Sequence, residues 1–371
     1  IMDNPRIFHI DTSRTWRGGQ RQVAYLMTEL KKSNLWTHLV CQPGSKLAEF
    51  CKTMQLSFSE ILMRGELDFI SAYKISKLLI KFEAHILHVH TAHGLSIGLL
   101  SKLFYPKIKL IYTKRVAYQM KNNVMSAFKY RNSYLNKIVC ISEYIRNSMK
   151  DQGINEEKLL VITSGIILPE VQPLDKSAFK MKYSIPQNSF IITTIASLEK
   201  NKGYINLINA AQYVLNHDKD IHFLALGKGK HEAELRKKVN NMGLSDHFHF
   251  LGFQEDTLSF LHISDLFVLP SREEGLGSSI LDAQAVGVPV IATKTGGIPE
   301  LIEHNVNGIL VAVDDSIQLA KKILELKQNP QLMQKLSDAA RISVQKFSIH
   351  KTIESYIDLY HFLMKTNPLS V

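Results

Sequence analysis

Residues 270–279 read Pro-Ser-Arg-Glu-Glu-Gly-Leu-Gly-Ser-Ser, between a short apolar run and a stretch with apolar residues at helical spacing. The run Leu266–Leu269 predicts a buried strand, and Ser278–Val286 predicts a helix. A strand that passes through a glycine-bearing loop into a helix is the repeating unit of parallel α/β sheets. The free N–H groups and the positive end of such a helix suit a diphosphate. We therefore expect this loop to bind an anionic ligand.

The same rhythm of β-branched runs and amphipathic stretches extends along the whole chain. Predicted strands of a first sheet are Arg6–Ile10, Thr37–Cys41, Ile86–His90, Lys109–Thr113, Lys137–Ile141 and Leu159–Thr163. Those of a second sheet are Ser189–Ile195, Ile221–Leu226, His247–Phe250, Leu266–Leu269 and Pro289–Ala292. Predicted helices are Gln20–Lys32, Ser71–Phe82, Ser177–Tyr183, Gly203–Leu215, His231–Met242, Thr257–His262, Ser278–Val286 and the region from Ser316 to about Met364.

This pattern predicts an α/β protein with two Rossmann-like, doubly wound domains. A stretch with Pro169, Pro173 and Pro186 separates the two sets of strands. We expect an N-terminal domain at 1–168, joined by a C-terminal helix at 350–371, and a C-terminal domain at 169–349. Ligands of such sheets lie beyond the carboxyl ends of the strands, so two facing domains would place the site in a central cleft.

Composition excludes several classes of protein. The 371 residues are 45% hydrophobic and 21% charged, as in an ordinary globular protein rather than a disordered one. The three cysteines form no C-x-x-C pair, so we expect neither a disulfide framework nor a cysteine zinc site. No uncharged apolar run reaches about 18 residues and no basic-then-apolar leader opens the chain. We expect a cytoplasmic protein, at most peripheral on the inner face of the cytoplasmic membrane.

Positive charge is concentrated in the first half of the chain. Residues 1–170 carry 24 Lys and Arg against 13 Asp and Glu, whereas residues 171–371 carry 21 of each. Residues 101–150 hold 11 basic residues and one acid, Glu143. One interpretation is a solvated basic face. The other is a surface for an anionic membrane or a phosphorylated acceptor. We do not expect nucleic acid, because no zinc finger, RNP-like aromatic pattern or basic tail accompanies the charge.

Two further loops could meet a phosphate or sugar. The pair Gly18-Gly19 lies between the first predicted strand and helix, where glycine allows close approach of backbone N–H groups. A tight turn would also require glycine there. The loop lacks G-x-G-x-x-G, so we do not expect a dinucleotide cofactor. In the second half, Asp282 lies about one helical turn after the 270–279 loop, so it can reach the same pocket as Glu274.

The segment from residue 270 onward resembles the signature of glycosyltransferase family 4, a retaining group with the GT-B fold whose bacterial members include envelope-glycan enzymes. The family pattern is P-S-x-x-E-G-F-G, then L-E-A-M-A, G-x-P-V and G-G, with two glutamates separated by seven residues. This chain has Glu274-x7-Asp282, so its second acid is one methylene shorter. Further matches are Gly227-Lys228-Gly229, Phe250–Phe253, Ile141–Glu143 and Ala196–Gly203.

The resemblance implies a nucleotide-sugar donor, retention of configuration and no metal. Glu274 would hold the donor sugar's hydroxyls, and Asp282 the ribose. In the family the last of these motifs often begins Gly-Arg, and its Arg and Lys grip the diphosphate. Here Lys202 is present and Ser197 takes the Arg position. We expect Lys114 or Arg115 to supply the missing cation from the other domain. Because no dedicated nucleophile is visible, we favour same-face attack over a covalent intermediate.

These considerations give three sets of site residues. The catalytic set is Glu274, Lys202, Arg115 and His90. The donor-binding set is Gly18, Gly19, Ser197, Lys202, Gly227, Phe253, Glu274, Gly275, Leu276, Gly277, Ser278 and Asp282. The acceptor-binding set is Arg17, Gln20, His93 and Lys114. We expect no metal and no cofactor besides the nucleotide-sugar substrate.

Some of these residues have structural alternatives. His85, His88, His90 and His93 gather around one strand end, but no carboxylate at ligand spacing joins them. We expect His90 and His93 to line the cleft and His88 to pack. Glu274 could instead pair with a nearby base such as Arg272. Asp218-Lys219-Asp220 matches the metal motif D-x-D of the other glycosyltransferase fold, yet it precedes a strand, so we interpret it as a polar loop.

We expect a hexosyltransferase that binds the acceptor with its N-terminal domain and the nucleotide-sugar with its C-terminal domain. The basic region 101–150 favours a membrane-associated or glycan acceptor, such as a lipopolysaccharide core. Two alternatives stay open. A nucleotide-sugar epimerase shares the fold and would turn over donor without acceptor. A non-catalytic nucleotide-sugar binding protein is possible because of the Ser197 and Asp282 departures.

Overall fold

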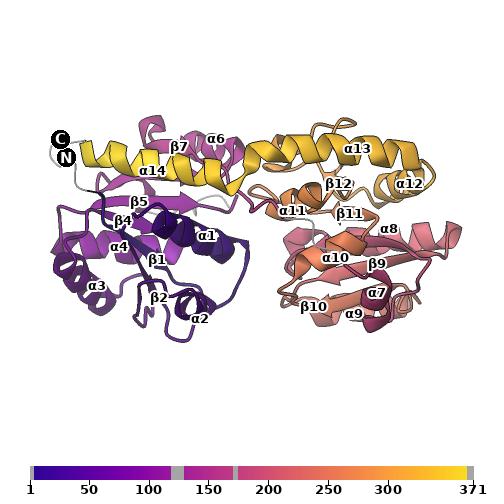
Figure 1. Cartoon of the computed structure of the whole chain (residues 1–371), viewed down its shortest axis with the longest axis horizontal. Coiled ribbons are helices and arrows are strands. Elements are labelled where there is room, and N and C mark those ends of the chain that lie inside the picture. The colour runs from indigo at the N-terminus through magenta and orange to yellow at the C-terminus, as the bar shows by residue number, and fades with distance from the viewer. Residues whose placement is uncertain (1–3, 118–128, 170–173, 366–371) are drawn as a thin grey trace. The chain divides into compact units, whose positions relative to one another are not determined.

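The computed structural model describes residues 4–117, 129–169 and 174–365. The chain divides into two compact units (Figure 1). Unit 1 consists of Ile1–Gly165 with Ile349–Val371, and unit 2 of Ile166–Ser348. Each unit is a parallel sheet with helices on both faces, which confirms the predicted α/β class with two doubly wound domains.

The sheet of unit 1 has seven parallel strands in the order β3-β2-β1-β4-β5-β6-β7. The strands are β1 Ile7–Asp11, β2 Thr37–Cys41, β3 Phe58–Glu60, β4 Ile86–Val89, β5 Lys109–Lys114, β6 Leu135–Cys140 and β7 Leu159–Val161. The helices are α1 Gly18–Lys32, α2 Lys46–Thr53, α3 Phe69–Lys81, α4 Ala92–Phe104, α6 Glu143–Asp151 and α14 Ile349–Lys365, with a 3-10 turn η1 Glu156–Lys158.

The sheet of unit 2 has six parallel strands in the order β10-β9-β8-β11-β12-β13. The strands are β8 Phe190–Ile195, β9 Ile221–Leu226, β10 Phe248–Gly252, β11 Leu266–Leu269, β12 Val290–Thr293 and β13 Ile309–Val311. The helices are α7 Lys176–Lys182, α8 Tyr204–His217, α9 Glu232–Asn241, α10 Thr257–Ile263, α11 Ser278–Val286, α12 Ser316–Lys327 and α13 Pro330–Ser343. Short 3-10 turns are η2 Lys200–Lys202, η3 Ile298–Glu300 and η4 Val344–Phe347.

Each sheet has one topological switch point, where the strand order reverses direction. In unit 1 it lies between β1 and β4, which pair in parallel register. In unit 2 it lies between β8 and β11. Ligands of open α/β sheets bind in the crevice outside the carboxyl ends of the strands at this point. The loops after β1, β4, β8 and β11 are therefore the places where chemistry is expected.

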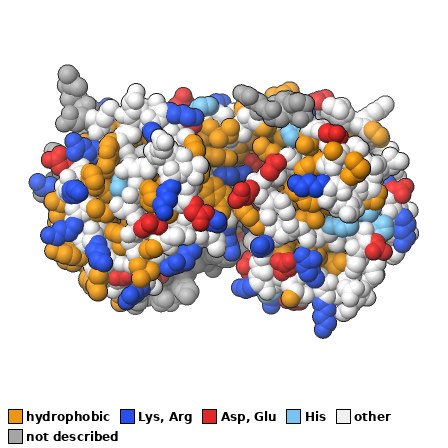
Figure 2. Space-filling view, turned by 60° about the horizontal axis from the view of Figure 1, so that its bottom comes forward, with side chains coloured by type: hydrophobic (Ala, Val, Ile, Leu, Met, Phe, Trp, Pro, Cys, Tyr) orange, Lys and Arg blue, Asp and Glu red, His pale blue; other side chains and the backbone are white. Residues whose placement is uncertain are grey.

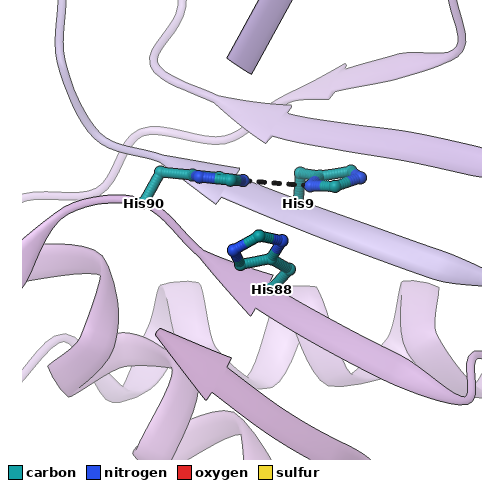
Figure 3. A group of neighbouring side chains, drawn as sticks. All are labelled: His9, His88 and His90. Atoms are coloured by element: carbon teal, nitrogen blue, oxygen red, sulfur yellow. Dashed lines mark hydrogen bonds between the residues drawn. The ribbon is translucent and has the colours of Figure 1, made fainter. Parts of the chain in front are cut away.

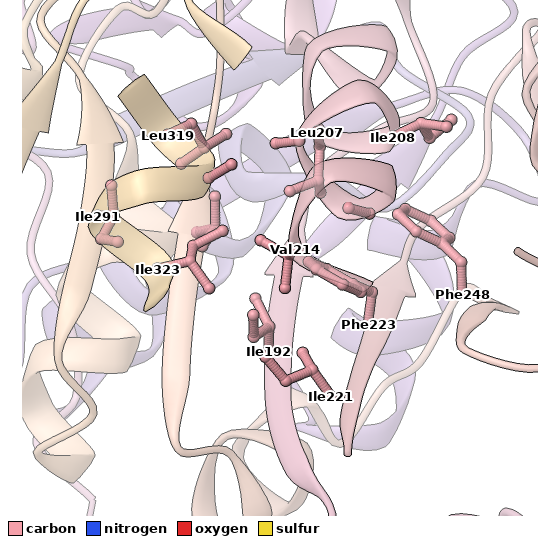
Figure 4. Close-up of a cluster of buried hydrophobic side chains, with 14 of the residues drawn as sticks. Ile192, Leu207, Ile208, Val214, Ile221, Phe223, Phe248, Ile291, Leu319 and Ile323 are labelled. Carbon is pink, nitrogen blue, oxygen red and sulfur yellow. The ribbon is translucent and has the colours of Figure 1, made fainter. Parts of the chain in front are cut away.

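Each sheet is covered by apolar helix faces. In unit 2, α8 and α12 pack their apolar sides against β8, β9 and β12, and the cluster in Figure 4 is buried between them. In unit 1, α14 returns from the end of the chain to pack beside α1, where Ile353, Tyr356 and Tyr360 join the core. Within the described ranges no helix combines the length and apolar character needed to cross a bilayer.

Several elements escaped the sequence analysis for physical reasons. The strands β3 and β13 are three residues long, too short for a periodic pattern. The helix α4 buries residues around most of its circumference, which leaves no polar stripe. Its glycine Gly94 lies against Val89 and Ile10, where a Cβ would leave too little room. The helix α6 is short, and Ser142 caps its first turn by accepting from the Ile145 N–H at 3.2 Å.

Candidate active site

In unit 2 the predicted donor residues gather at one edge of the sheet. Ser197 follows β8, Gly227 follows β9 and Phe253 follows β10. The segment 274–277 lies between β11 and α11, which begins at Ser278. Because all six strands are parallel, these loops emerge from the same carboxyl edge. The structure therefore brings together residues that are up to about eighty positions apart in sequence.

An ion pair occupies the switch point of unit 2. Lys202 Nζ lies 2.6 Å from Glu274 Oε1, and Ser271 Oγ donates to the same oxygen at 2.9 Å. The two charged side chains are partly accessible, at 19% and 11%. Glu274 thus does pair with a nearby base, as the structural alternative expected, but the base is Lys202 and not Arg272, whose Nε donates to Asp314 Oδ1 at 2.7 Å. Lys202 and Glu274, assigned separately from sequence, therefore form one polar unit.

Two glycines let neighbouring loops close around Glu274. Gly203, directly after Lys202, has φ +69°, and a Cβ there would overlap the Pro270 carbonyl oxygen. Gly296 has φ +55°, and a Cβ there would overlap the carbonyl oxygen of Glu274 itself. A side chain at either position would be strained and would push the loops apart. The close contact of these loops fixes the backbone that carries the ion pair.

The helix α11 begins beside this ion pair. Its first residues, Ser278 and Ser279, place free N–H groups and the positive end of the helix after the Glu274 loop. Leu276 is only 2% exposed as a whole residue, so its predicted contact with the donor stays a prediction. Asp282, one turn into the helix, is 7% exposed. Its contact with a ribose stays a prediction.

Three other predicted donor residues, Gly227, Ser197 and Phe253, follow strands of unit 2. The Gly227 N–H donates to the Gly252 carbonyl at 2.8 Å, so it holds β9 to β10. Ser197 is half-buried in the loop after β8 and introduces no charge where the family pattern has an Arg. Phe253 is 43% exposed, which leaves its ring available for a flat ligand.

In unit 1 the glycine pair lies at the start of α1. Arg115, just after β5, packs its side chain against Gly19, where a Cβ would lie 3.3 Å from Arg115 Cδ. Its Nη1 donates to Ser164 Oγ at 3.4 Å. Arg115 Nε is buried and has no hydrogen-bond partner among the described residues. The structure thus brings Arg115 and the glycine pair to one edge of unit 1.

Gln20 is committed to an internal contact. Its Nε2 donates to Asp11 Oδ2 at 3.1 Å, and the side chain is buried. Asp11 ends β1, and burial raises its pKa to about 6 against the opposing effects of Ser13, Gln20 and Arg115. The sequence analysis missed Asp11. The signal was available, because a polar residue at the carboxyl end of a buried strand marks the ligand edge of a sheet.

Three histidines meet at the switch point of unit 1 (Figure 3). His9 on β1 and His90 after β4 share a hydrogen bond of 3.0 Å between Nδ1 and Nε2. His88 lies against both, and ligand nitrogens of the three residues lie within 4.8 Å of one another. Burial lowers the pKa of His9 to about 3 and those of His88 and His90 well below the usual value. The three rings are therefore neutral near pH 7.

His88 links this group to the C-terminal helix. Its Nδ1 shares a hydrogen bond of 2.8 Å with the Tyr360 hydroxyl, and its Nε2 one of 2.7 Å with Thr113 Oγ1. Thr113 in turn lies 3.2 Å from the Tyr356 hydroxyl. Both nitrogens of His88 are thus engaged, which matches the packing role expected for it and leaves neither free for a metal.

The remaining predicted acceptor residues differ in accessibility. Arg17 is exposed at the N-terminus of α1, and His93 is half-buried in the first turn of α4. Lys114 is only 4% exposed, with Nζ 5.7 Å from the centre of the Tyr130 ring. Lys114 therefore does not present its charge at the surface as the acceptor assignment requires, whereas Arg17 does.

The D-x-D match lies away from these edges. Asp218 follows α8 and precedes β9, at the amino end of the strand, and it pairs with Lys327. Its side chain also accepts from the Asp220 N–H at 3.0 Å. This arrangement supports the interpretation as a polar loop.

Comparisons with known proteins cover both units. The family model described as "Glycosyltransferase Family 4" matches residues 16–168, and that of "Glycosyl transferases group 1" matches residues 175–343. An uncharacterized glycosyltransferase of Methanocaldococcus jannaschii is 30% identical over 81% of this chain and 82% of its own. A UDP-Gal:alpha-D-GlcNAc-diphosphoundecaprenol alpha-1,3-galactosyltransferase of Escherichia coli is 24% identical over 96% of each chain.

A solved structure has the same fold. Anabaena HepE in complex with UDP-glucose superposes with a TM-score of 0.86, at 20% identity, over 96% of this chain and 99% of its own. The two relatives and the solved structure each cover four fifths or more of both chains. The chain belongs to glycosyltransferase family 4 and is a nucleotide-sugar-dependent glycosyltransferase of the retaining, GT-B type.

Proposed function

We propose that this enzyme moves a hexosyl group from a UDP-sugar to a hydroxyl of a lipid-linked or glycan acceptor, such as a lipopolysaccharide core, with retention and without a metal. The main support for the proposed donor site is the Lys202–Glu274 ion pair at the switch point of unit 2, close to the N-terminus of α11. The choice of UDP follows the names of the E. coli relative and the HepE complex.

The donor binds to unit 2 through charge complementarity. The diphosphate oxygens accept hydrogen bonds from the Lys202 ammonium and from the free N–H groups of Ser278 and Ser279. The sugar hydroxyls donate to the Glu274 carboxylate. As the sugar–phosphate bond breaks, negative charge grows on the leaving diphosphate. Fixed cations and N–H dipoles stabilise that charge more in the transition state than in the ground state.

Unit 1 binds the acceptor. Arg17 and His93 offer polar groups near the edge after β1 and β4, and Arg115 adds a cation beside the glycine pair. Lys114 is less suited than Arg115 to offer its charge to a ligand, because Lys114 is only 4% exposed. His90 is also buried and shares a hydrogen bond with His9. We therefore propose that it orients His9 in addition to the catalytic role expected for it.

Metal independence follows from the donor set at the unit 2 edge. Lys202 and the α11 N-terminus supply the positive charge that a divalent cation supplies in enzymes with a D-x-D site. The Asp218 segment cannot serve, because it lies at the amino end of β9 and is paired with Lys327. We therefore expect transfer to continue in the presence of a chelator.

The test is a transfer assay with UDP-, GDP- and ADP-linked hexoses and a GlcNAc-diphospholipid acceptor, with and without EDTA. We expect acceptor-dependent release of UDP, an α-linked product from an α-linked donor by NMR, and no effect of EDTA. A changed free sugar nucleotide without acceptor would indicate an epimerase. Loss of turnover with EDTA, or a β-linked product, would contradict the mechanism.

A further inference from the structure

One side of unit 1 exposes large apolar side chains on two neighbouring helices. They belong to the start and outer side of α3 and to the end of α4, which packs against α3. We call this surface the α3–α4 face. Its apolar members, between 42% and 70% exposed, are Leu67, Phe69, Ile70, Tyr73, Ile80, Leu103 and Phe104.

The exposure is not a consequence of a loosely packed helix. The inner side of α3 is fully buried through Ala72, Ile75 and Leu79. The outer residues also bridge the two helices, since the rings of Tyr73 on α3 and Phe104 on α4 meet edge to face at 5.5 Å. A soluble surface rarely leaves such a connected apolar area uncovered unless it binds something. The α3–α4 face therefore needs a partner.

Lysines lie among these apolar residues. Lys74, Lys77 and Lys81 are exposed along α3, and Lys107 is exposed just after α4. No ion pair between described residues involves any of the four. Lys77 Nζ lies 5.2 Å from the centre of the Tyr73 ring, so apolar and cationic groups are in direct contact. Figure 2 shows this intermingling of hydrophobic and basic side chains over unit 1.

The acids near the face are engaged elsewhere. Glu83 pairs with Arg6 at 2.9 Å, and Glu66 pairs with Lys129 at 3.3 Å. Asp68 caps α3 by accepting from the Ser71 N–H at 2.9 Å. The face thus combines exposed apolar groups with an excess of positive charge, which is complementary to an anionic lipid surface and not to a neutral protein core.

The basic segment 101–150 is a weaker candidate for the same role. Lys102 is buried and donates to the Tyr134 carbonyl at 3.0 Å, and burial lowers its pKa to about 8. Lys114 and Lys129 are also buried. Residues 118–128 lie outside the described residues. Three of the eleven basic residues of the segment are therefore buried inside unit 1, whereas its exposed Lys107 belongs to the α3–α4 face.

We propose that the α3–α4 face docks onto an anionic lipid bilayer. The apolar side chains enter the boundary between headgroups and acyl chains, while the lysines remain at the level of the phosphates. Docking places unit 1 at a membrane, where a lipid-linked acceptor would lie, so its purpose rests on the proposed function. The binding itself does not, because the face shares no residue with either switch point.

The experiment is co-sedimentation of the full chain with phosphatidylcholine vesicles, with and without phosphatidylglycerol. We expect binding to the anionic vesicles, reduced by salt. Lys74→Gln with Lys77→Gln should weaken it about 25-fold, from about fivefold per lysine. Phe69→Ser with Ile70→Ser should weaken it by about tenfold or more through lost apolar insertion.

Matched controls come from unit 2. Lys237→Gln with Lys335→Gln removes the same charge from exposed helix positions, and Ile342→Ser removes an apolar side chain that is 76% exposed. These variants should bind vesicles like the wild type. Equal loss in the controls, or no binding by the wild type, would overturn the proposal. So would a dimer in solution that the Phe69 and Ile70 variant dissociates, because a second copy would then cover the face.

UDP binding by calorimetry separates this proposal from the donor site. The face variants should bind UDP as the wild type does. If UDP binds and the vesicles do not, only the membrane proposal fails. If the vesicles bind and UDP does not, only the donor-site proposal fails.

Discussion

The two units carry different kinds of polar residues at the same position of the fold. Both carry polar residues at the switch point of a parallel sheet, between β1 and β4 in unit 1 and between β8 and β11 in unit 2. In unit 2 the residues are a charged, partly accessible pair, Lys202 and Glu274. In unit 1 they include three buried histidines that are held neutral by desolvation.

This difference in charge and exposure suits the ion pair of unit 2 to ligand binding and the histidines of unit 1 to a structural role. An accessible ion pair can exchange its internal partner for a diphosphate and a sugar at modest desolvation cost. A buried neutral network cannot take up charge without losing stability, but it fixes geometry, as His88 does between β5 and α14. The ligand edge of a doubly wound sheet therefore needs to be judged by charge and exposure, and not by position alone.

The largest expected effect is on the charged pair. Glu274→Gln or Lys202→Ala should lower kcat by about 10² to 10³, because each removes a fixed group that stabilises the transition state. Initial rates of UDP release in the presence of acceptor measure this loss. Lys200→Ala is the matched control, since Lys200 is an exposed lysine of the same 3-10 turn. A comparable loss in that variant would mean that the turn matters only through its overall charge.

Two glycine variants separate the contribution of the loop contact around the ion pair from that of backbone strain alone. Gly203→Ala should lower the free energy of unfolding by about 2–4 kcal/mol, because it combines a left-handed φ with overlap of the Pro270 carbonyl. Gly243→Ala has nearly the same φ, +66°, with nothing within 4 Å of the added Cβ. It should cost about 1 kcal/mol. Urea unfolding of both variants measures the difference, and equal losses would show that the loop contact contributes nothing.

The neutral histidines of unit 1 predict a pH dependence of stability. The pKa of His9 is about 3 in the folded chain and 6.5 in the unfolded chain, so the unfolded chain binds the proton first as the pH falls. Stability present above pH 6.5 is therefore lost between pH 6.5 and 3. At pH 5 the loss from His9 alone is about 2 kcal/mol.

His9→Gln removes this contribution, so its stability should fall less than that of the wild type between pH 7 and pH 5. Urea midpoints at the two pH values measure it. His350→Gln is the control, because the His350 side chain is 77% exposed. A wild-type slope in the His9 variant would show that its ring is not the group protonated on unfolding.

Local pattern was enough to predict much of the fold and the edge of unit 2 at which Lys202 and Glu274 meet. Strands such as Ile221–Leu226 and Leu266–Leu269 have the bounds that their largely apolar runs predict. The rule that ligands lie at carboxyl strand ends placed Lys202 and Glu274 on one edge although 72 positions separate them. Their direct pairing was not predicted, because spacing fixes which edge a loop joins and not which side chain it contacts.

The contacts at the carboxyl edge of unit 1 were harder to predict because they are not local. His9 meets His90 only because β1 and β4 pair across 81 positions, and nothing near His9 in sequence marks it. Gln20 appeared available in a glycine-rich loop, yet it donates to Asp11. Charge counting likewise failed to distinguish exposed lysines from buried ones such as Lys102. Burial and partner choice depend on the tertiary fold, which composition does not encode.

The central claim is that the carboxyl edge of unit 2 binds a nucleoside diphosphate through Lys202. Isothermal calorimetry of UDP, GDP and ADP with the wild type, Lys202→Ala and Lys200→Ala, in EDTA, tests it most directly. We expect UDP to bind the wild type and Lys200→Ala alike, and the Kd to rise by about tenfold or more in Lys202→Ala, as for loss of a charged hydrogen bond. Unchanged affinity in Lys202→Ala, or no nucleotide binding at all, would contradict the account.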